Sequence, residues 1–209
     1  MTTITRLADS CILVETDAGT TLVDPGFFTF DSGVVDLDSL GDIQRVLVTH
    51  EHGDHVKPEF VRWLVDRGPD VVVHSNQAVA DLLTSHDIEV ATGPLTDVSF
   101  EDVLHEPVPS GAMPPNRAYT IGGVVTHPGD SQQVTSSAAI MALPLLAPWT
   151  SMTEAVRFAA RLAPRQVFPI HDFFTSGSGR AALLGIASGV LADHGIELIR
   201  LDWGDSFTV

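Results

Sequence analysis

The stretch from Val46 to His55, VLVTHEHGDH, limits what the chain can fold into more than any other segment. It begins as an apolar, β-branched run, which predicts a strand covered on both faces. Three histidines and two acidic residues then follow within six positions. Neutral imidazole and carboxylate are the ligands that divalent cations such as zinc prefer. The segment therefore predicts a metal site at the end of a buried strand.

The spacing inside this segment indicates how one loop could serve two ions. His50 and His52 are two residues apart, so they point the same way on an extended chain. Asp54 and His55 follow Gly53, where the chain can turn. The alternative is a surface loop that happens to be rich in histidine. It requires four metal-binding residues in six positions by coincidence, and we therefore favour the metal site.

Composition limits the class of protein. With 209 residues, of which 44% are hydrophobic, the chain can bury a sizeable core, and we expect one domain over residues 1–209. The sequence has neither an apolar run long enough to span a bilayer nor an N-terminal export signal, so we expect a soluble, cytoplasmic protein without a membrane partner. The single cysteine, Cys11, fits a reducing compartment and is expected to be a small buried hydrophobe. A formal net charge of -16 without a basic stripe argues against nucleic acid as a partner.

Hydrophobic periodicity predicts alternating strands and helices in the first half of the chain and short antiparallel strands between 88 and 125. Ser151 and Glu154 form a capping box for a helix that ends before Pro164. The other predicted helices begin at 58 and cover 77–86 and 181–194, and the predicted strands cover 11–16, 20–24, 45–49, 71–74, 138–146, 166–170 and 197–201. Strands and helices in this order predict an α/β domain with mixed sheets.

Four motifs occur in the order found in a known family. THEHGDH resembles the H-x-H-x-D-H signature of the metallo-β-lactamase superfamily. TLVDPG, HPGDS and VFPIH are similar to its early strand-ending aspartate, its Gly-Asp element and its closing strand-end histidine. The resemblance spans nearly the whole chain and is strongest to short bacterial metal-dependent hydrolases and their lactonase-like relatives. It implies a four-layer αββα sandwich of two mixed β-sheets.

The resemblance also implies a set of metal ligands. His50 and His52 would bind the first ion, Asp54, His55 and His171 the second, and Asp130 would bridge both. Asp24 would either hold ligand histidines by hydrogen bonds or be a turn residue before Pro25. The implied cofactors are two divalent ions, zinc first, with manganese or iron as alternatives.

One ligand position departs from the family pattern. The family has a further histidine for the first ion, and the alignment of this region places Glu101 there. A carboxylate can bind zinc, so we expect Glu101 to be a ligand, with His105 as the other candidate. Residues four apart on an extended strand share a face, which allows both to approach the site. An acidic ligand at this position would weaken the first site.

The family chemistry implies a hydrolase. Metal-activated water would attack a carbonyl or a phosphorus, and Asp54 would orient that water and carry its proton. A lactone, another ester or a phosphodiester would suit this chemistry as the small-molecule substrate. The alternative is a degenerate metal-binding or ligand-sensing scaffold without hydrolytic turnover, and oxidative chemistry at a single iron lies between the two. The sequence leaves a homo-oligomer open.

Residues outside the ligand set have less specific interpretations. The glycine-rich stretch 175–180 and its Arg180 would hold an anionic substrate group, or would only begin a helix. Phe27, Phe28, Phe30 and Trp149 would form apolar walls beside the site, or would pack in the core. His127 is expected to have a structural role.

Overall fold

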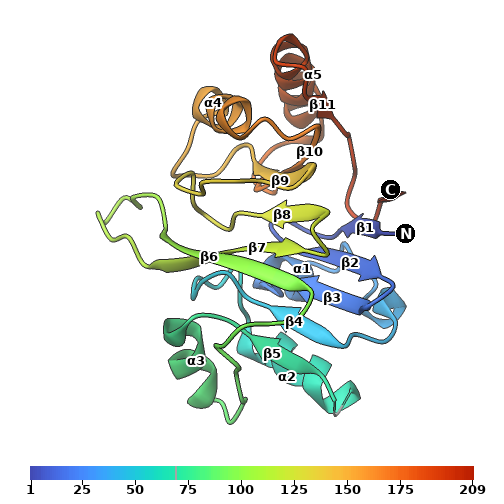
Figure 1. Ribbon diagram of the computed structural model, residues 1–209, viewed down its shortest axis with the longest axis vertical. Coiled ribbons are helices and arrows are strands. Elements are labelled where there is room, and N and C mark those ends of the chain that lie inside the picture. Colours follow the sequence, from blue (N-terminus) through green and yellow to red (C-terminus); the bar gives the residue numbers. More distant parts are fainter. Residues whose placement is uncertain (69) are drawn as a thin grey trace.

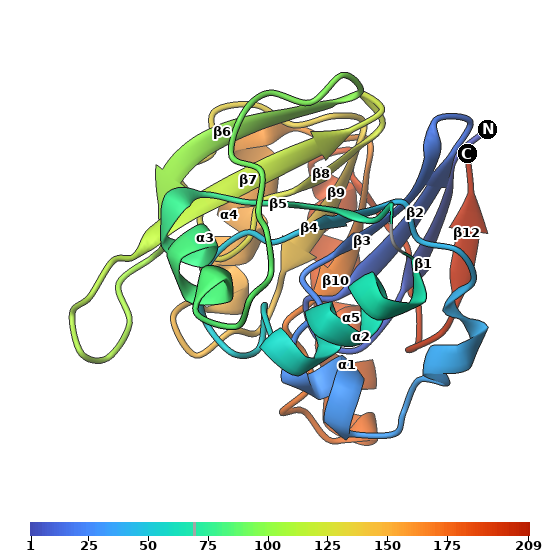
Figure 2. The ribbon, with the colours of Figure 1, turned by 90° about the horizontal axis from the view of Figure 1, so that it is seen from below.

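Two six-stranded mixed sheets lie face to face, and helices cover their outer faces (Figures 1 and 2). The computed structural model describes residues 1–68 and 70–209. The strand orders are β12-β1-β2-β3-β4-β5 and β11-β10-β9-β8-β7-β6. The predicted αββα sandwich is confirmed.

The bounds of the elements are as follows. The first sheet contains β1 (Thr3–Arg6), β2 (Ile12–Thr16), β3 (Gly19–Val23), β4 (Arg45–Leu47), β5 (Val72–His74) and β12 (Ser206–Thr208). The second contains β6 (Val98–Leu104), β7 (Pro115–Ile121), β8 (Val125–His127), β9 (Ile140–Pro144), β10 (Gln166–Ile170) and β11 (Glu197–Leu198). The helices are α1 (Phe27–Asp31), the 3₁₀ helix η1 (Leu37–Leu40), α2 (Pro58–Arg67), α3 (Gln77–Thr84), α4 (Met152–Leu162) and α5 (Gly177–Asp193).

Alternation along the strands separates three apolar layers. On β2, Ile12 and Val14 face the second sheet, while Leu13 faces the outer helices. On β9, Ile140 likewise joins the core between the sheets, and Met141 joins the layer under α4 and α5. Successive side chains of a strand point to opposite faces, so strands that are apolar at every position become covered on both sides. This is why the apolar runs of the sequence lie in the middle of the sandwich.

Local signals placed most helices close to their predicted bounds. α4 follows its predicted capping box, because the Ser151 side chain accepts a hydrogen bond from the Glu154 main-chain N–H at 3.2 Å. α5 begins at Gly177, four residues before the predicted start, since the Ser176 side chain caps it. The predicted strand 197–201 is shorter, as only Glu197–Leu198 pair with β10.

The two terminal strands were missed by the sequence analysis. β12 pairs with β1 across nearly the whole chain length, with Thr3 opposite Thr208. Both strands are short and carry polar residues, so their pairing has no local sequence signal.

Two other expectations concern burial. Cys11 is a buried free cysteine, and burial raises the pKa of its thiol, as expected for a small apolar residue. None of the helices in the described part of the chain combines the length and the apolar character that a bilayer crossing requires.

Strand direction brings distant segments to one edge of the sandwich. β3 and β4 run parallel, and β1 has the same direction because two antiparallel pairings separate it from β3. In the second sheet β8, β9 and β10 run parallel, and β6 shares their direction through β7. The segments that follow these strands carry the polar residues of the candidate site.

Candidate metal centre

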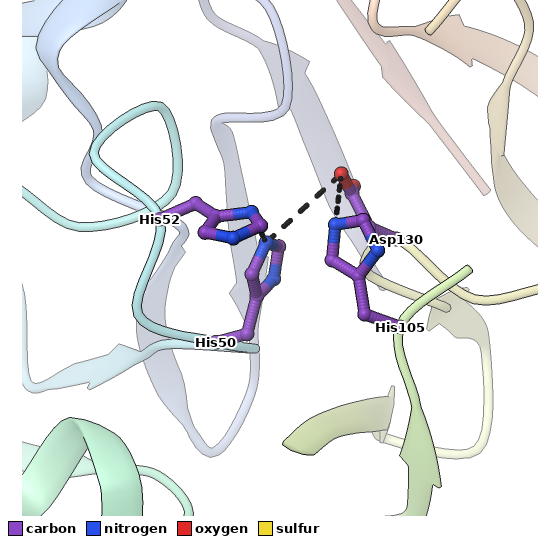
Figure 3. Close-up of side chains that lie close together, drawn as sticks. All are labelled: His50, His52, His105 and Asp130. Atoms are coloured by element: carbon purple, nitrogen blue, oxygen red, sulfur yellow. Dashed lines mark hydrogen bonds and ion pairs between the residues drawn. The ribbon is translucent and has the colours of Figure 1, made fainter. Parts of the chain in front are cut away.

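A first cluster of metal-binding side chains contains three histidines and one aspartate (Figure 3). His50, His52, His105 and Asp130 each place one ligand atom within 4.8 Å of the others. His105 Nε2 lies 3.1 Å from Asp130 Oδ2, and His50 Nε2 lies 3.0 Å from His52 Nδ1. His50, His105 and Asp130 are buried, whereas His52 is partly open to solvent.

A second cluster adjoins the first on the other side of the same carboxylate. Asp54, His55 and His171 place ligand atoms within 4.8 Å of one another. Asp130 Oδ1 lies 3.1 Å from His55 Nε2 and 2.7 Å from His171 Nε2. The two oxygens of Asp130 thus face different clusters, which is the arrangement that a bridging carboxylate requires.

The Nδ1 atoms of three histidines face fixed oxygen atoms. The partners are Asp24 for His55 at 2.6 Å, the main-chain oxygen of Glu106 for His105, and Asp9 for His171 at 3.3 Å. Because these oxygens can only accept, each imidazole carries its proton on Nδ1 when neutral, and its Nε2 lone pair faces the cluster.

The surroundings of the Nε2 atoms of these three histidines show whether a cation fits between the clusters. They are buried and have no hydrogen-bond partner among the described residues, and the same is true of Asp130 Oδ1. Leaving a buried polar atom unpaired costs about 1–3 kcal/mol. Several such atoms facing one another, all from imidazole and carboxylate groups, match the donor set of zinc, manganese or iron. The residues present therefore fit divalent metal.

Asp24 holds the start of the histidine loop. Its Oδ1 accepts a hydrogen bond from the Thr49 main-chain N–H at 2.7 Å, and its Oδ2 accepts from Thr49 Oγ1 at 2.9 Å and from His55. Asp24 is fully buried with a φ of 52°, a backbone conformation that aspartate tolerates better than most residues. Asp24 therefore holds His55 by a hydrogen bond, as the first of the two sequence interpretations expected.

Glu101, which the sequence analysis expected as a ligand, lies outside both clusters, and His105, the other candidate, lies in the first one. Glu101 lies inside β6, and its Oε2 accepts hydrogen bonds from the Thr135 main-chain N–H at 3.0 Å and from Thr135 Oγ1 at 3.2 Å. Four strand residues span roughly 13 Å, so Glu101 lies far along the sheet from His105. β6 ends at Leu104, and His105, the next residue, places its Nε2 3.1 Å from Asp130 Oδ2.

Arg180 does not face the site as an anion-binding group. Its Nε donates to Asp172 at 2.5 Å, and its two terminal nitrogens donate to Asp202 and to the Leu201 main-chain oxygen, each at 2.5 Å. Asp172 also pairs with Arg6, which is fully buried. This network anchors the residue next to His171, so the structural interpretation of Arg180 is the correct one.

Two residues that position ligands were missed by the sequence analysis. Asp9, with a φ of 57°, approaches Nδ1 of His171 and also accepts from the Phe173 main-chain N–H at 3.3 Å. Asn116 accepts from the Asp130 main-chain N–H at 3.0 Å and donates to Pro128 O at 2.9 Å. Asp9 is 162 positions from His171 and Asn116 is 14 positions from Asp130, so no local motif connects either residue with its partner.

His127 has the structural role expected of it. Its Nδ1 accepts from the Gly129 main-chain N–H at 3.1 Å, so its Nε2 carries the proton and donates to Ser10 O at 2.8 Å. Burial lowers the pKa of His127, which keeps the ring neutral. It joins the loop that carries Asp130 to the loop before β2.

Neighbouring carboxylates and imidazoles shift one another's pKa values in the clusters. Burial alone would lower the pKa of His171, but the carboxylates of Asp130 and Asp9 outweigh it and raise that pKa to about 10. Burial would also lower the pKa of His55. The carboxylates of Asp130, Asp24 and Asp54 outweigh this effect, so the pKa of His55 lies well above its ordinary value. Burial would raise the pKa of Asp130, but His171 and His55 hold it well below its usual range.

Metal loading is therefore expected to release protons even at pH 8, because a metal ligand must be deprotonated. The ion pairs of His171 with Asp130 and Asp9 stabilise the metal-free fold. This stabilisation is fully present below the ordinary histidine pKa of 6.5 and is lost as pH rises through about 10. Apparent zinc affinity should rise across the same window. Calorimetric zinc titrations at pH 8, in two buffers of different ionisation enthalpy, measure the protons released. Heats that are independent of the buffer would contradict this expectation.

The comparisons with known proteins agree with the fold. The profile of the metallo-beta-lactamase superfamily matches residues 4–135. Protein Rv0786c of Mycobacterium tuberculosis is 26% identical over 197 residues, covering 87% of this chain and 89% of its own length.

Two solved structures show the same architecture. Igni18, a metallo hydrolase from the hyperthermophilic archaeon Ignicoccus hospitalis, aligns with a TM-score of 0.75 and 17% identity, over 100% of this chain and 99% of that one. The metallo-beta-lactamase fold protein YhfI from Bacillus subtilis aligns with a TM-score of 0.68 and 16% identity, over 99% and 98%. The profile match covers more than half of the sequence, and the chain belongs to the metallo-beta-lactamase superfamily.

Proposed function

We propose that the chain is a metal-dependent hydrolase with two divalent ions, zinc being the best match to the donor set. The observation that carries this proposal is the Asp130 carboxylate, whose two oxygens face two separate groups of histidines. His50, His52 and His105 would hold one ion, Asp54, His55 and His171 the other, and Asp130 both. When bound, such ions act as Lewis acids that polarise a carbonyl oxygen and make water more acidic.

Asp54 is the residue best suited to carry a proton. Its side chain is 30% exposed, whereas that of Asp130 is only 3% exposed. Among the described residues none donates a hydrogen bond to the Asp54 carboxylate, and its Oδ2 lies 3.8 Å from His55 Nε2. A carboxylate that is open to solvent and has no hydrogen-bond donor can accept a proton from attacking water and pass it to the leaving group.

The charges around the site favour a neutral substrate. Lys57 follows the histidine loop, but its Nζ binds both oxygens of Asp31 at 2.7 and 2.6 Å. Arg180 follows His171 and is bound by Asp172 and Asp202. With both nearby cations paired and a formal net charge of -16, a phosphodiester would lack a side chain to balance its charge. We infer that a lactone or another uncharged ester is the preferred substrate.

Aromatic rings beside the clusters support the same substrate class. The Phe27 ring lies against Gly53, and the Phe28 ring stacks on Phe173 with centroids 4.1 Å apart. Phe174 is 74% exposed and packs edge-on against Phe28 at 5.3 Å. Apolar side chains next to a few polar groups are typical of small-molecule sites. These rings would contact the apolar part of an ester.

The alternative, a scaffold without turnover, depended on an acidic ligand in the first cluster. His105 supplies an imidazole at that place instead. Hydrolytic turnover is the property that distinguishes a metal-dependent hydrolase from a metal-binding scaffold.

The test uses zinc-loaded protein and protein treated with a chelator. We expect the loaded protein to hydrolyse neutral lactones or aryl esters, and we expect chelation to remove this activity. Bis(p-nitrophenyl) phosphate should be hydrolysed more slowly, because Lys57 and Arg180 are already paired with carboxylates and would not add to the hold of the ions on its phosphate. Metal-loaded protein that turns over no ester would support the scaffold, and a preference for the phosphodiester would overturn the substrate class.

A further inference from the structure

Trp149 lies against both histidine clusters. It is half-buried in the loop between β9 and α4. Its ring meets the His105 ring edge-on with centroids 5.7 Å apart, and it meets the His171 ring edge-on at 6.1 Å. The indole thus contacts one histidine from each cluster.

The indole N–H has a specific acceptor. Trp149 Nε1 donates a hydrogen bond to Asp130 Oδ2 at 2.6 Å. This is the oxygen that faces His105 at 3.1 Å and His50 at 4.0 Å. The other groups that face this carboxylate are imidazoles of the two clusters: His105 at Oδ2, and His55 and His171 at Oδ1. The hydrogen bond from Trp149 therefore fixes the rotation of the Asp130 carboxylate at Oδ2, the oxygen that faces the first cluster.

The loop that carries Trp149 is tied to both segments that supply ligands. Gln132 Nε2 donates to Thr150 Oγ1 at 2.7 Å, which joins the loop to the segment after Asp130. The Leu145 main-chain N–H donates to Ile170 O at 3.1 Å, next to His171. These contacts place the indole with respect to both clusters.

We propose that Trp149 is a positioning residue that holds the Asp130 carboxylate in its bridging orientation and acts chiefly on the ion of the first cluster. The inference rests on the proposed two-ion centre. A hydrogen bond to a carboxylate ligand fixes the direction of its lone pairs, and loss of such a partner commonly lowers metal affinity about 10- to 100-fold. Oδ2 loses its donor when Trp149 is replaced, whereas the surroundings of Oδ1 do not change.

Trp149→Phe tests this inference, because it keeps an aromatic ring and removes only the N–H donor. Trp203→Phe is the matched control, since Trp203 Nε1 is buried without a hydrogen-bond partner and its ring stacks on Phe173 at 5.0 Å. Both variants are titrated with Co²⁺, whose paramagnetism shifts the NMR signals of the histidines that bind it, so that His50, His52 and His105 report the first cluster and His55 and His171 the second. In Trp149→Phe we expect first-cluster affinity to fall about 10-fold or more and second-cluster affinity to stay nearly unchanged. Trp203→Phe should match the wild type.

A second measurement uses the unmodified chain. It has three tryptophans and therefore gives three indole N–H signals in a ¹⁵N-labelled sample. Zinc should shift one of them strongly, and that signal should be the one missing from Trp149→Phe.

The outcomes separate this inference from the proposed function. Wild-type protein that binds no ion would overturn both. If the wild type binds two ions and Trp149→Phe has the same metal affinity at both clusters, only the role of Trp149 is overturned. The same holds if Trp149→Phe loses affinity equally at both clusters. An indole N–H signal of Trp149 that does not shift with zinc, in wild-type protein that binds both ions, would also overturn only the role of Trp149.

Discussion

Replacement of Asp130 by asparagine is expected to remove hydrolytic activity and to weaken both metal sites together. The variant keeps the shape of the side chain but loses the negative charge shared by His55, His105 and His171. Loss of several kcal/mol of interaction with the ions corresponds to roughly a thousandfold or more in rate. Steady-state hydrolysis and zinc content, measured on the same samples, check this result.

The matched control is Asp38→Asn. Asp38 is an exposed carboxylate that pairs with Arg67 on the surface. This variant should keep full activity and zinc content. An Asp130→Asn protein that folds, retains both ions and turns over substrate at the wild-type rate would exclude the bridging role.

A second large effect is expected at Gly26, far from any ligand in the sequence. A Cβ atom at this position would lie 1.8 Å from the main-chain oxygen of Asp54 and 2.9 Å from the main-chain nitrogen of His55. Main-chain bonds from Phe27 to Gly53 and from Lys57 to Pro25, both 2.9 Å, hold the two segments at this distance. Gly26→Ala must therefore displace the histidine loop.

For Gly26→Ala we expect a loss of zinc binding and a loss of stability of about 1–3 kcal/mol, as for overpacking in a tight interior. Chemical denaturation and zinc titration measure the two effects. Gly185→Ala is the control, because a Cβ there meets nothing within 4 Å on an exposed helix face. It should raise stability by up to about 1 kcal/mol. Normal zinc binding by Gly26→Ala would show that the loop can move without harm to the site.

The parts of the site that could be predicted are those with a local signal. His50, His52, Asp54 and His55 share one loop, so their spacing alone indicates a cluster. Asp130 and His171 stand alone in the sequence, and only the resemblance connected them to that loop. The structure brings all six together.

The errors arise where tertiary contacts override a local pattern. Glu101 and His105 share a face on an ideal strand, but they lie roughly 13 Å apart along it, so Glu101 binds Thr135 whereas His105 reaches Asp130. Asp9 approaches His171 from 162 positions earlier in the chain, and β1 finds its partner β12 at the other terminus. No periodicity or motif reports such contacts, because they depend on which strand ends meet at one edge of the sandwich.

The central claim is that the two clusters hold two divalent ions around Asp130. It is tested most directly by the metal content of the wild-type chain, measured by elemental analysis after zinc reconstitution and removal of loosely bound ions. We expect close to two zinc ions per chain, as the two groups of ligands that share Asp130 require. A chain that retains no zinc after reconstitution, while it remains folded, would contradict the account.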